Sequence, residues 1–165
     1  MTDNPSLGHE SNFVRIREAD TDDKFSDDVT IEIGKEYEVF VYYHNNAGKN
    51  MNLTAYDVRV KANFSTTLDK GQAGEVKCTI TSSNSEPEAV YDCAYIHSEV
   101  ACKAYYVQGS AVIHNGGTAD GTVLAGDDLF GQGAIIYYDK DKPGDIPGCN
   151  DYAGYVTFRI KIYEP

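Results

Sequence analysis

The sequence predicts an all-β protein, an antiparallel β-sandwich of about eight to ten strands. Its 165 residues include thirteen Tyr, fifteen Gly and no Trp, and short runs rich in Val, Ile and Thr alternate with turn residues, a composition typical of strands and tight turns. No long window places apolar residues at the i, i+3, i+4 and i+7 positions of an amphipathic helix. Residues 154–163 alternate strictly between apolar and polar side chains, as in a strand with one buried and one solvated face.

The strands are predicted from alternating or continuous apolar runs that are bounded by Gly, Pro, Asn and Asp. Residues 37–44 are apolar on both faces, so we expect a central strand there. We find no internal repeat and predict one domain over residues 12–165, after a polar and flexible leader at residues 1–11. In chain order the predicted strands are residues 12–18, 28–33, 37–44, 55–64, 75–82, 89–97, 103–107, 110–114, 134–139 and 154–163.

The charge balance and the hydropathy exclude several classes of protein. With 14 basic and 26 acidic residues the chain has a net charge of −12, which repels nucleic-acid phosphates and anionic lipid. No stretch approaches the roughly 20 apolar residues of a membrane-spanning helix. The first residues lack the apolar core of a signal peptide, so secretion would require a signal that has already been removed.

The four cysteines, Cys78, Cys93, Cys102 and Cys149, are predicted to form two disulfides. A zinc site is disfavoured because the chain has no CxxC pair and no His at zinc-finger spacing. Cys78 and Cys93 flank a single predicted turn, which suggests one pair across a hairpin and leaves Cys102 with Cys149. Each closure would stabilise the fold by roughly 3–4 kcal/mol and indicates an oxidising, extracellular compartment. Reduced core cysteines are the alternative.

No catalytic residue can be nominated from the sequence. The chain lacks GxSxG, HExxH and phosphate-loop motifs, and no motif selects a pair of carboxylates for glycoside hydrolysis. A catalytic Cys would need a neighbouring general base. The four histidines, His9, His44, His97 and His114, are scattered. We therefore expect no enzyme activity and no cofactor.

An acidic loop around Asp20, Asp22 and Asp23 is a weak calcium candidate, because hard cations prefer clustered carboxylates. Its spacing does not fit an EF-hand, since Lys24 and Phe25 occupy the positions of a ligand and the required Gly. A second cluster at residues 139–145 is interrupted by two lysines. Solvated loop charge is the favoured interpretation, and no metal is expected.

The tyrosines and two sequons supply the remaining candidate surface features. Where two tyrosines are adjacent in a predicted strand, one ring should face inward and the other outward. The outward rings either form a contact surface for sugar or protein, or they fill space at the rim of the sheet. Loops 45–52 and 115–130 would border such a surface. The sequons at Asn52 and Asn63 are candidate glycosylation sites if the host glycosylates them. The pairs are Tyr42 and Tyr43, Tyr105 and Tyr106, and Tyr137 and Tyr138.

Three segments, residues 41–47, 106–116 and 133–162, carry a family resemblance. The chain resembles the conserved repeat domain of bacterial and archaeal cell-surface proteins, most specifically in GAIIYYDKDKPGDIPGCNDYAGYVTFRIKI. The resemblance extends from about Phe13 to Tyr163. It implies an immunoglobulin-like β-sandwich, a secreted or wall-attached location, a structural or adhesive role and no catalytic residues. Cys149 matches the cysteine of the family's IPGC motif, whereas the other three cysteines have no fixed counterpart.

The sequence therefore suggests a non-enzymatic extracellular subunit of a surface layer or filament, whose partners are copies of itself or other surface proteins. Residues 12–18 could be donated to a neighbour's sheet, with Phe13, Val14 and Ile16 as the buried plugs. A head-to-tail contact of this kind does not close and builds a filament. The same residues could instead be the first strand of their own sandwich. The alternative function is an adhesin-like module that binds carbohydrate or a host protein through exposed Tyr and loops.

Overall fold

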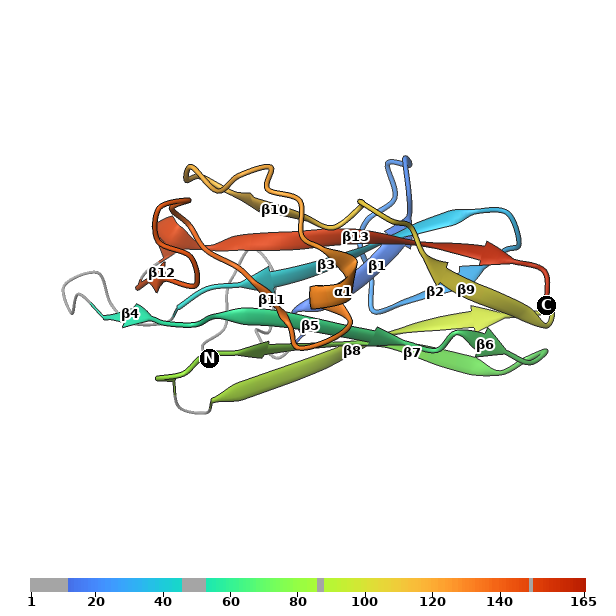
Figure 1. Cartoon of the computed structure of the whole chain (residues 1–165). Coiled ribbons are helices and arrows are strands. Elements are labelled where there is room, and N and C mark those ends of the chain that lie inside the picture. Colours follow the sequence, from blue (N-terminus) through green and yellow to red (C-terminus); the bar gives the residue numbers. More distant parts are fainter. Residues whose placement is uncertain (1–11, 46–52, 86–87, 149) are drawn as a thin grey trace.

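Two mainly antiparallel β-sheets lie face to face along the length of the molecule (Figure 1). The computed structural model describes residues 12–45, 53–85, 88–148 and 150–165. The larger sheet has the order β1 (Val14–Glu18), β3 (Glu36–Tyr43), β13 (Gly154–Tyr163), β9 (Cys102–Tyr106) and β6 (Thr67–Leu68), with β10 (Val112–Asn115) beside the first half of β13. The smaller sheet has the order β11 (Ala134–Ile135), β5 (Arg59–Phe64), β7 (Ala73–Thr81), β8 (Ala89–Ser98) and β2 (Asp28–Ile31).

Several short elements lie outside the two sheets. Strands β4 (Thr54–Ala55) and β12 (Ile146–Pro147) pair with each other outside the two sheets. A single helical turn, α1 (Gly126–Leu129), contacts β5, and a 3₁₀ turn at Asn150–Tyr152 precedes β13. The all-β class predicted from the sequence is confirmed.

The core lies between the sheets, where alternate residues of each strand turn inward. The pattern is clearest in β13 and β3, because every second side chain is buried and the intervening ones are at least partly exposed. Each large apolar side chain that is removed from water contributes about 1.5–3 kcal/mol. The inward-facing residues of the two longest strand systems are Tyr37, Val39, Val41, Tyr43, Val156, Phe158, Ile160 and Ile162 from the larger sheet, and Val60, Ala62, Val76, Cys78, Ala94 and Ile96 from the smaller one.

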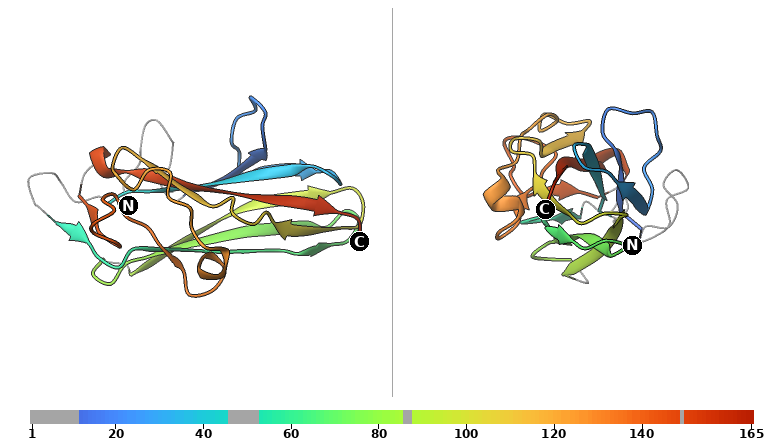
Figure 2. Two further views of the ribbon diagram at one scale, coloured as in Figure 1. Left: turned by 45° about the horizontal axis from the view of Figure 1, so that its top comes forward. Right: turned by 90° about the vertical axis from the view of Figure 1, so that its right-hand side faces the viewer.

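The first two strands belong to different sheets. Strand β1 runs antiparallel to β3, and β2 runs parallel to β8. The connecting loop, residues 19–27, folds back so that the backbones of Ile16 and Ser26 exchange two hydrogen bonds of 2.8 and 3.0 Å. The chain therefore bridges the two sheets along this side, and the loop stands out from the long body of the sandwich (Figure 2).

Two local predictions need correction, and the prediction of a central strand at residues 37–44 is confirmed. The strand predicted at residues 55–64 is divided, because Asp57 has a φ of 51° and turns the chain between β4 and β5. The strand predicted at 134–139 ends at Ile135, and irregular backbone with a bend at residues 138–139 follows. Strand β3 is central as expected, but it is not buried on both faces: its outward side chains are only half-buried. Their partial cover comes from side chains of neighbouring strands and of loop 19–27, as described below.

Candidate functional site

The candidate donor segment completes the sheet of its own chain in this structure. Phe13 is 3% exposed, and Val14 and Ile16 are fully buried in the inter-sheet core. Strand β1 pairs along its whole length with β3, from Val14 opposite Val41 to Glu18 opposite Tyr37. The sequence left two roles open for residues 12–18, a strand donated to a neighbour or the first strand of their own sandwich. In the described fold these residues form a strand of their own sandwich.

Asp92 of the opposite sheet holds the beginning of β1. Its Oδ2 accepts a hydrogen bond of 2.9 Å from the backbone N–H of Val14. Burial raises the pKa of this carboxyl above its ordinary value, although the hydrogen bonds from Val14, Cys93 and Phe13 act in the other direction. Sequence reasoning missed Asp92. The available signal was an acid at an inward position of the alternating run AVYDCAYIH.

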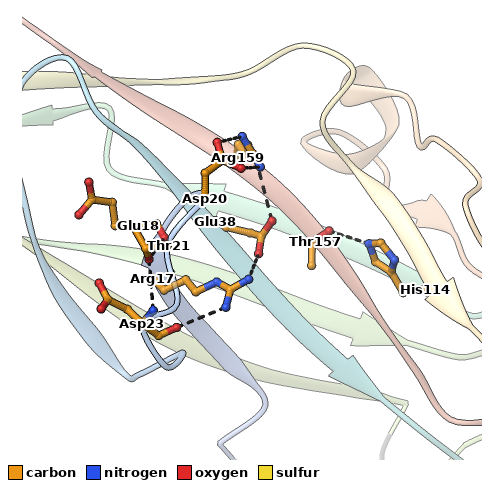
Figure 3. Close-up of polar contacts among 9 residues, drawn as sticks. All are labelled: Arg17, Glu18, Asp20, Thr21, Asp23, Glu38, His114, Thr157 and Arg159. Atoms are coloured by element: carbon orange, nitrogen blue, oxygen red, sulfur yellow. Dashed lines mark hydrogen bonds and ion pairs between the residues drawn. The ribbon is translucent and has the colours of Figure 1, made fainter.

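Loop 19–27 is fastened to the outer face of the larger sheet by an ion pair. The Arg159 guanidinium donates hydrogen bonds of 2.8 and 3.0 Å to the two carboxylate oxygens of Asp20 (Figure 3). The hydrogen bond and the charge of Arg159 hold the pKa of Asp20 below its ordinary value. Glu38 lies between two cations, 3.1 Å from Arg17 and 4.0 Å from Arg159. Asp20 adopts a positive φ of 60°, a conformation in which Asp and Asn are enriched.

In the weak calcium candidate, the guanidinium of Arg159 occupies the position beside Asp20 where a calcium ion was considered. Asp20 is engaged by Arg159, and Arg17 Nη1 donates to the backbone carbonyl of Asp23 at 3.3 Å. Thr21 Oγ1 donates to the carbonyl of Glu18 at 2.8 Å and so tightens the turn. In the described part of the chain, no group of three or more His, Cys, Asp or Glu side chains is arranged to hold a metal ion.

Four ring side chains from different segments stack across the outer face of the larger sheet. We call Phe25, Phe40, Tyr155 and His114 the aromatic ladder; successive ring centroids are 5.1, 4.8 and 4.7 Å apart. The Arg17 guanidinium lies 4.1 Å from the Phe25 ring at one end. At the other end His114 Nε2 is 2.9 Å from Thr157 Oγ1 (Figure 3). Tyr155 and His114 are stacked with an interplanar angle of 19°, whereas the other two contacts are tilted by 31 and 38°. The rings of the ladder therefore pack on one another and limit the surface on which a sugar could stack.

The predicted inward and outward alternation holds for two of the tyrosine pairs. Tyr43 is buried while Tyr42 faces outward, and Tyr105 is half exposed while Tyr106 packs against the core. The third pair, residues 137 and 138, lies beyond the end of β11, and both of its side chains are partly buried. The pair rule missed the most exposed ring, Tyr91 at 66%, and its neighbour Tyr95 at 45%, both on the outer face of β8.

The predicted disulfide between Cys78 and Cys93 is wrong, because the two side chains point to opposite faces of the sheet. Cys78 is opposite Asp92, and Cys93 is opposite Lys77, so a register offset of one residue separates them. Cys78, Cys93 and Cys102 are all free thiols. Burial raises the pKa of the Cys78 thiol. The pKa of Cys93 is also raised, chiefly by burial and secondly by the negative charge of Glu75.

The second predicted pair joined Cys102 to Cys149. Cys102 is buried and free, with its Sγ 3.4 Å from Ser98 Oγ. Cys149 lies outside the described residues. The disulfide staples expected from the sequence are therefore not found in the described part of the chain.

The remaining sequence features are distributed over the surface. Asn63 is exposed on the outer face of β5, whereas Asn52 and most of loop 45–52 lie outside the described residues. In loop 115–130, Asn115 Nδ2 donates to the carbonyl of Tyr137 at 2.9 Å and to the Tyr43 hydroxyl at 3.3 Å. Burial raises the pKa of Tyr43 to about 12. The start of this loop is thus fixed to the core.

Across the described residues, none of the helices combines the length and the apolar character needed to cross a bilayer. Comparison of the chain with protein-family models, with curated proteins and with solved structures finds no match in any of the three.

Proposed function

We propose that the chain is a non-enzymatic, extracellular structural subunit of a cell-surface layer or filament. We further propose that its sandwich is immunoglobulin-like and of the conserved repeat type that residues 133–162 resemble. Two face-to-face sheets with a common core support this assignment. The strand order places β1 and β13 in one sheet, so the likeness lies in the two-layer architecture, which immunoglobulin-like domains share without always sharing one topology.

The position of β1 is the observation that carries an assembly role. This strand is at one end of the larger sheet, and it inserts Val14 and Ile16 completely into the core. The exposed loop 19–27 connects it to the rest of the fold. An equivalent strand from a neighbouring copy would make the same hydrogen bonds with β3 and fill the same space, so exchange conserves contacts and requires only a rearranged hinge.

A reversible covalent lock tests the exchange. Val14 and Val41 are opposite each other in β1 and β3, and their pair is not hydrogen-bonded because the flanking Tyr42 N–H donates to the Phe13 carbonyl. Cα atoms in such pairs are about 4.5 Å apart, within the range that a disulfide spans. In the double variant Val14→Cys/Val41→Cys, oxidation joins β1 to its own sheet.

In electron micrographs taken at about 0.15 M salt, where exposed charge contacts are screened, we expect filaments or sheets of the reduced variant and none of the oxidised one. The same protein in its two redox states is the matched control, and the wild-type chain in both buffers controls for its native thiols. Assembly that proceeds equally in the oxidised variant would show that exchange of β1 is not the mechanism. A wild-type chain that stays monomeric at high concentration would refute the assembly role itself.

Glycan binding is a second candidate because Tyr91 and Tyr95 make no ring-to-ring contact with another described residue. Both rings are exposed on the outer face of the smaller sheet, and the Lys77 ammonium lies 4.4 Å from the centroid of the Tyr91 ring. This function predicts signals on a glycan array that Tyr91→Ala and Tyr95→Ala reduce and Tyr105→Ala leaves unchanged. An array without signals for the wild-type chain rejects it.

A further inference from the structure

The outer face of the smaller sheet carries two lysines beside an open tyrosine. Lys61 of β5, Thr79 of β7 and Tyr91 of β8 occupy one row across the sheet, and Lys77 belongs to the next row. The Lys77 ammonium lies 4.4 Å from the centroid of the Tyr91 ring. We call Lys61, Lys77 and Tyr91 the lysine–tyrosine patch.

The positive charge of this patch is not compensated locally. Among the described residues, no carboxylate lies within the 4.0 Å ion-pair distance of Lys61 or Lys77. Lys35 and Arg159 differ from them, since they pair with Glu32 at 3.0 Å and with Asp20 at 2.8 Å. Glu75, two residues from Lys77 on β7, lies opposite Tyr95 and borders the patch. The patch is therefore a basic region on a chain of net charge −12.

The opposite side of the molecule presents acidic side chains on a fixed support. Asp22 and Asp23 are exposed on loop 19–27, which is fastened by the Asp20–Arg159 ion pair and by stacking of Phe25 on Phe40. The loop rises above the larger sheet, whereas β5, β7 and β8 form the lower layer in Figures 1 and 2. Because the loop is already ordered, docking it on a partner requires little further loss of conformational entropy.

We propose that loop 19–27 of one copy docks on the lysine–tyrosine patch of the next, with Asp22 and Asp23 facing Lys61 and Lys77. This inference rests on the proposed function as an assembling subunit and names a contact between subunits. The two surfaces are complementary in charge and lie on opposite sides of the molecule. Their contact is therefore heterologous, and its repetition adds subunits in one direction without closing.

The contact is electrostatic and exposed, which fixes its salt dependence. The screening length is about 30 Å at 0.01 M salt and about 8 Å at 0.15 M, so association should be strongest at low ionic strength. The general repulsion between two chains of like net charge is also strongest there. Salt dependence alone is therefore insufficient as a test, and charge reversal with a matched control is required.

The test uses the oxidised Val14→Cys/Val41→Cys protein, in which β1 cannot exchange and any association comes from surface contacts. Sedimentation velocity over a concentration series at low salt measures that association. We expect Lys61→Glu/Lys77→Glu and Asp22→Lys/Asp23→Lys each to weaken it by at least about tenfold. The control Lys70→Glu/Lys103→Glu makes the same change in net charge away from the patch and should retain association.

Mixing the two charge-reversed proteins is the decisive arm. In the mixture, each loop meets a patch of opposite charge, so we expect association to return to within about threefold of the unreversed protein. If the mixture stays monomeric, or if the reversals have no more effect than the control, the proposed contact is wrong.

Failure of this contact is distinguishable from failure of the proposed function. A locked protein that does not associate at low salt overturns the contact, even where the reduced protein polymerises and the assembly role stands. Glycan binding that Tyr91→Ala abolishes, combined with unchanged association, would assign the patch to a sugar and also overturn the contact.

Discussion

Asp20 and Arg159 are 139 positions apart in the sequence and form a bidentate ion pair with N–O distances of 2.8 and 3.0 Å. The planar guanidinium matches both oxygens of the carboxylate, which makes this geometry directional as well as attractive. Asp20 is solvent-exposed, where an ion pair contributes little to global stability. The main consequence of the pair is local: it fixes loop 19–27 on β13.

The variant Asp20→Asn should loosen the loop without unfolding the protein. Asn tolerates the positive φ of this position but cannot keep the charge-assisted pair. We expect faster amide hydrogen exchange at Ser26, whose N–H donates to the Ile16 carbonyl, while amides of β13 remain protected. The neighbouring substitution Asp22→Asn is the control and should change neither. Equal exchange at Ser26 in the wild type and in Asp20→Asn would mean that the ion pair does not hold the loop.

The same pair gives a defined pH dependence. Because Arg159 lowers the pKa of Asp20 in the folded state, the ionised carboxylate is favoured by folding. Its contribution is fully present above the unfolded value of about 3.9 and is lost as the pH falls through the lowered folded value. Thermal melts of the wild type and of Asp20→Asn should therefore converge below pH 4. A difference that stays constant across this range contradicts the assignment.

The side chain of Asp92 should stabilise β1 by accepting a hydrogen bond from the Val14 N–H, and the amide oxygen of an Asn at this position could accept the same bond. Asp92→Ala leaves buried N–H groups near Val14 without an acceptor, which costs about 1–3 kcal/mol, whereas Asp92→Asn keeps one acceptor oxygen. Urea denaturation of both variants measures these differences. Equal losses in the two variants would show that packing rather than hydrogen bonding is responsible.

The pKa of Asp92 predicts an opposite pH trend to that of Asp20. Burial raises it in the folded state, so its contribution is fully present below the unfolded value and is lost as the pH rises through the folded one. The stability of the wild type relative to Asp92→Asn should therefore decline with rising pH in the weakly acidic range. Denaturation curves at several pH values check the sign.

The described cysteines should behave as thiols of very different accessibility. Cys78 and Cys102 are fully buried, so iodoacetamide should modify them only on unfolding, while the partly exposed Cys93 should react slowly because its pKa is raised and the thiolate is the nucleophile. Peptide mass spectrometry of native and unfolded samples distinguishes the three sites. Recovery of a disulfide-linked peptide pair containing Cys78 and Cys93 would contradict the observed register.

Gly154 begins β13 in a space that excludes a side chain. A Cβ there would lie 2.6 Å from both the His114 carbonyl oxygen and the Tyr43 hydroxyl. Gly154→Ala should therefore destabilise the fold by about 1–3 kcal/mol through overpacking. Gly116→Ala is the matched control, since its Cβ would meet only the Tyr138 hydroxyl at 3.5 Å. Denaturation midpoints that fall equally for both variants would contradict the steric explanation.

The long alternating strands were predictable because their inward side chains repeat with period two. Residues 154–163 form β13 with the bounds expected, and the strand at 37–44 is central between β1 and β13. The two-residue strands and α1 were not predictable, since their position depends on contacts with distant segments. Asp57 shows the same limit: a single residue with positive φ divides a run that alternates without interruption.

The candidate surfaces depended even more on tertiary contacts. Alternation shows which residues of a strand face outward, but not which neighbours cover them. Tyr155 packs against Phe40 and His114 and is 37% exposed, whereas Tyr91, beside lysine and threonine, is 66% exposed.

By itself the sequence determined the all-β class, the main strands and the excess of acidic charge, because these follow from local periodicity and composition. Only the tertiary structure decided how strands are paired and in which register. Register placed Cys78 and Cys93 on opposite faces of one strand pair, and the fold brought Arg159 to Asp20. The physical reason is that hydrogen-bonded pairing couples residues far apart in the chain, and a shift of one residue exchanges the two faces of a strand.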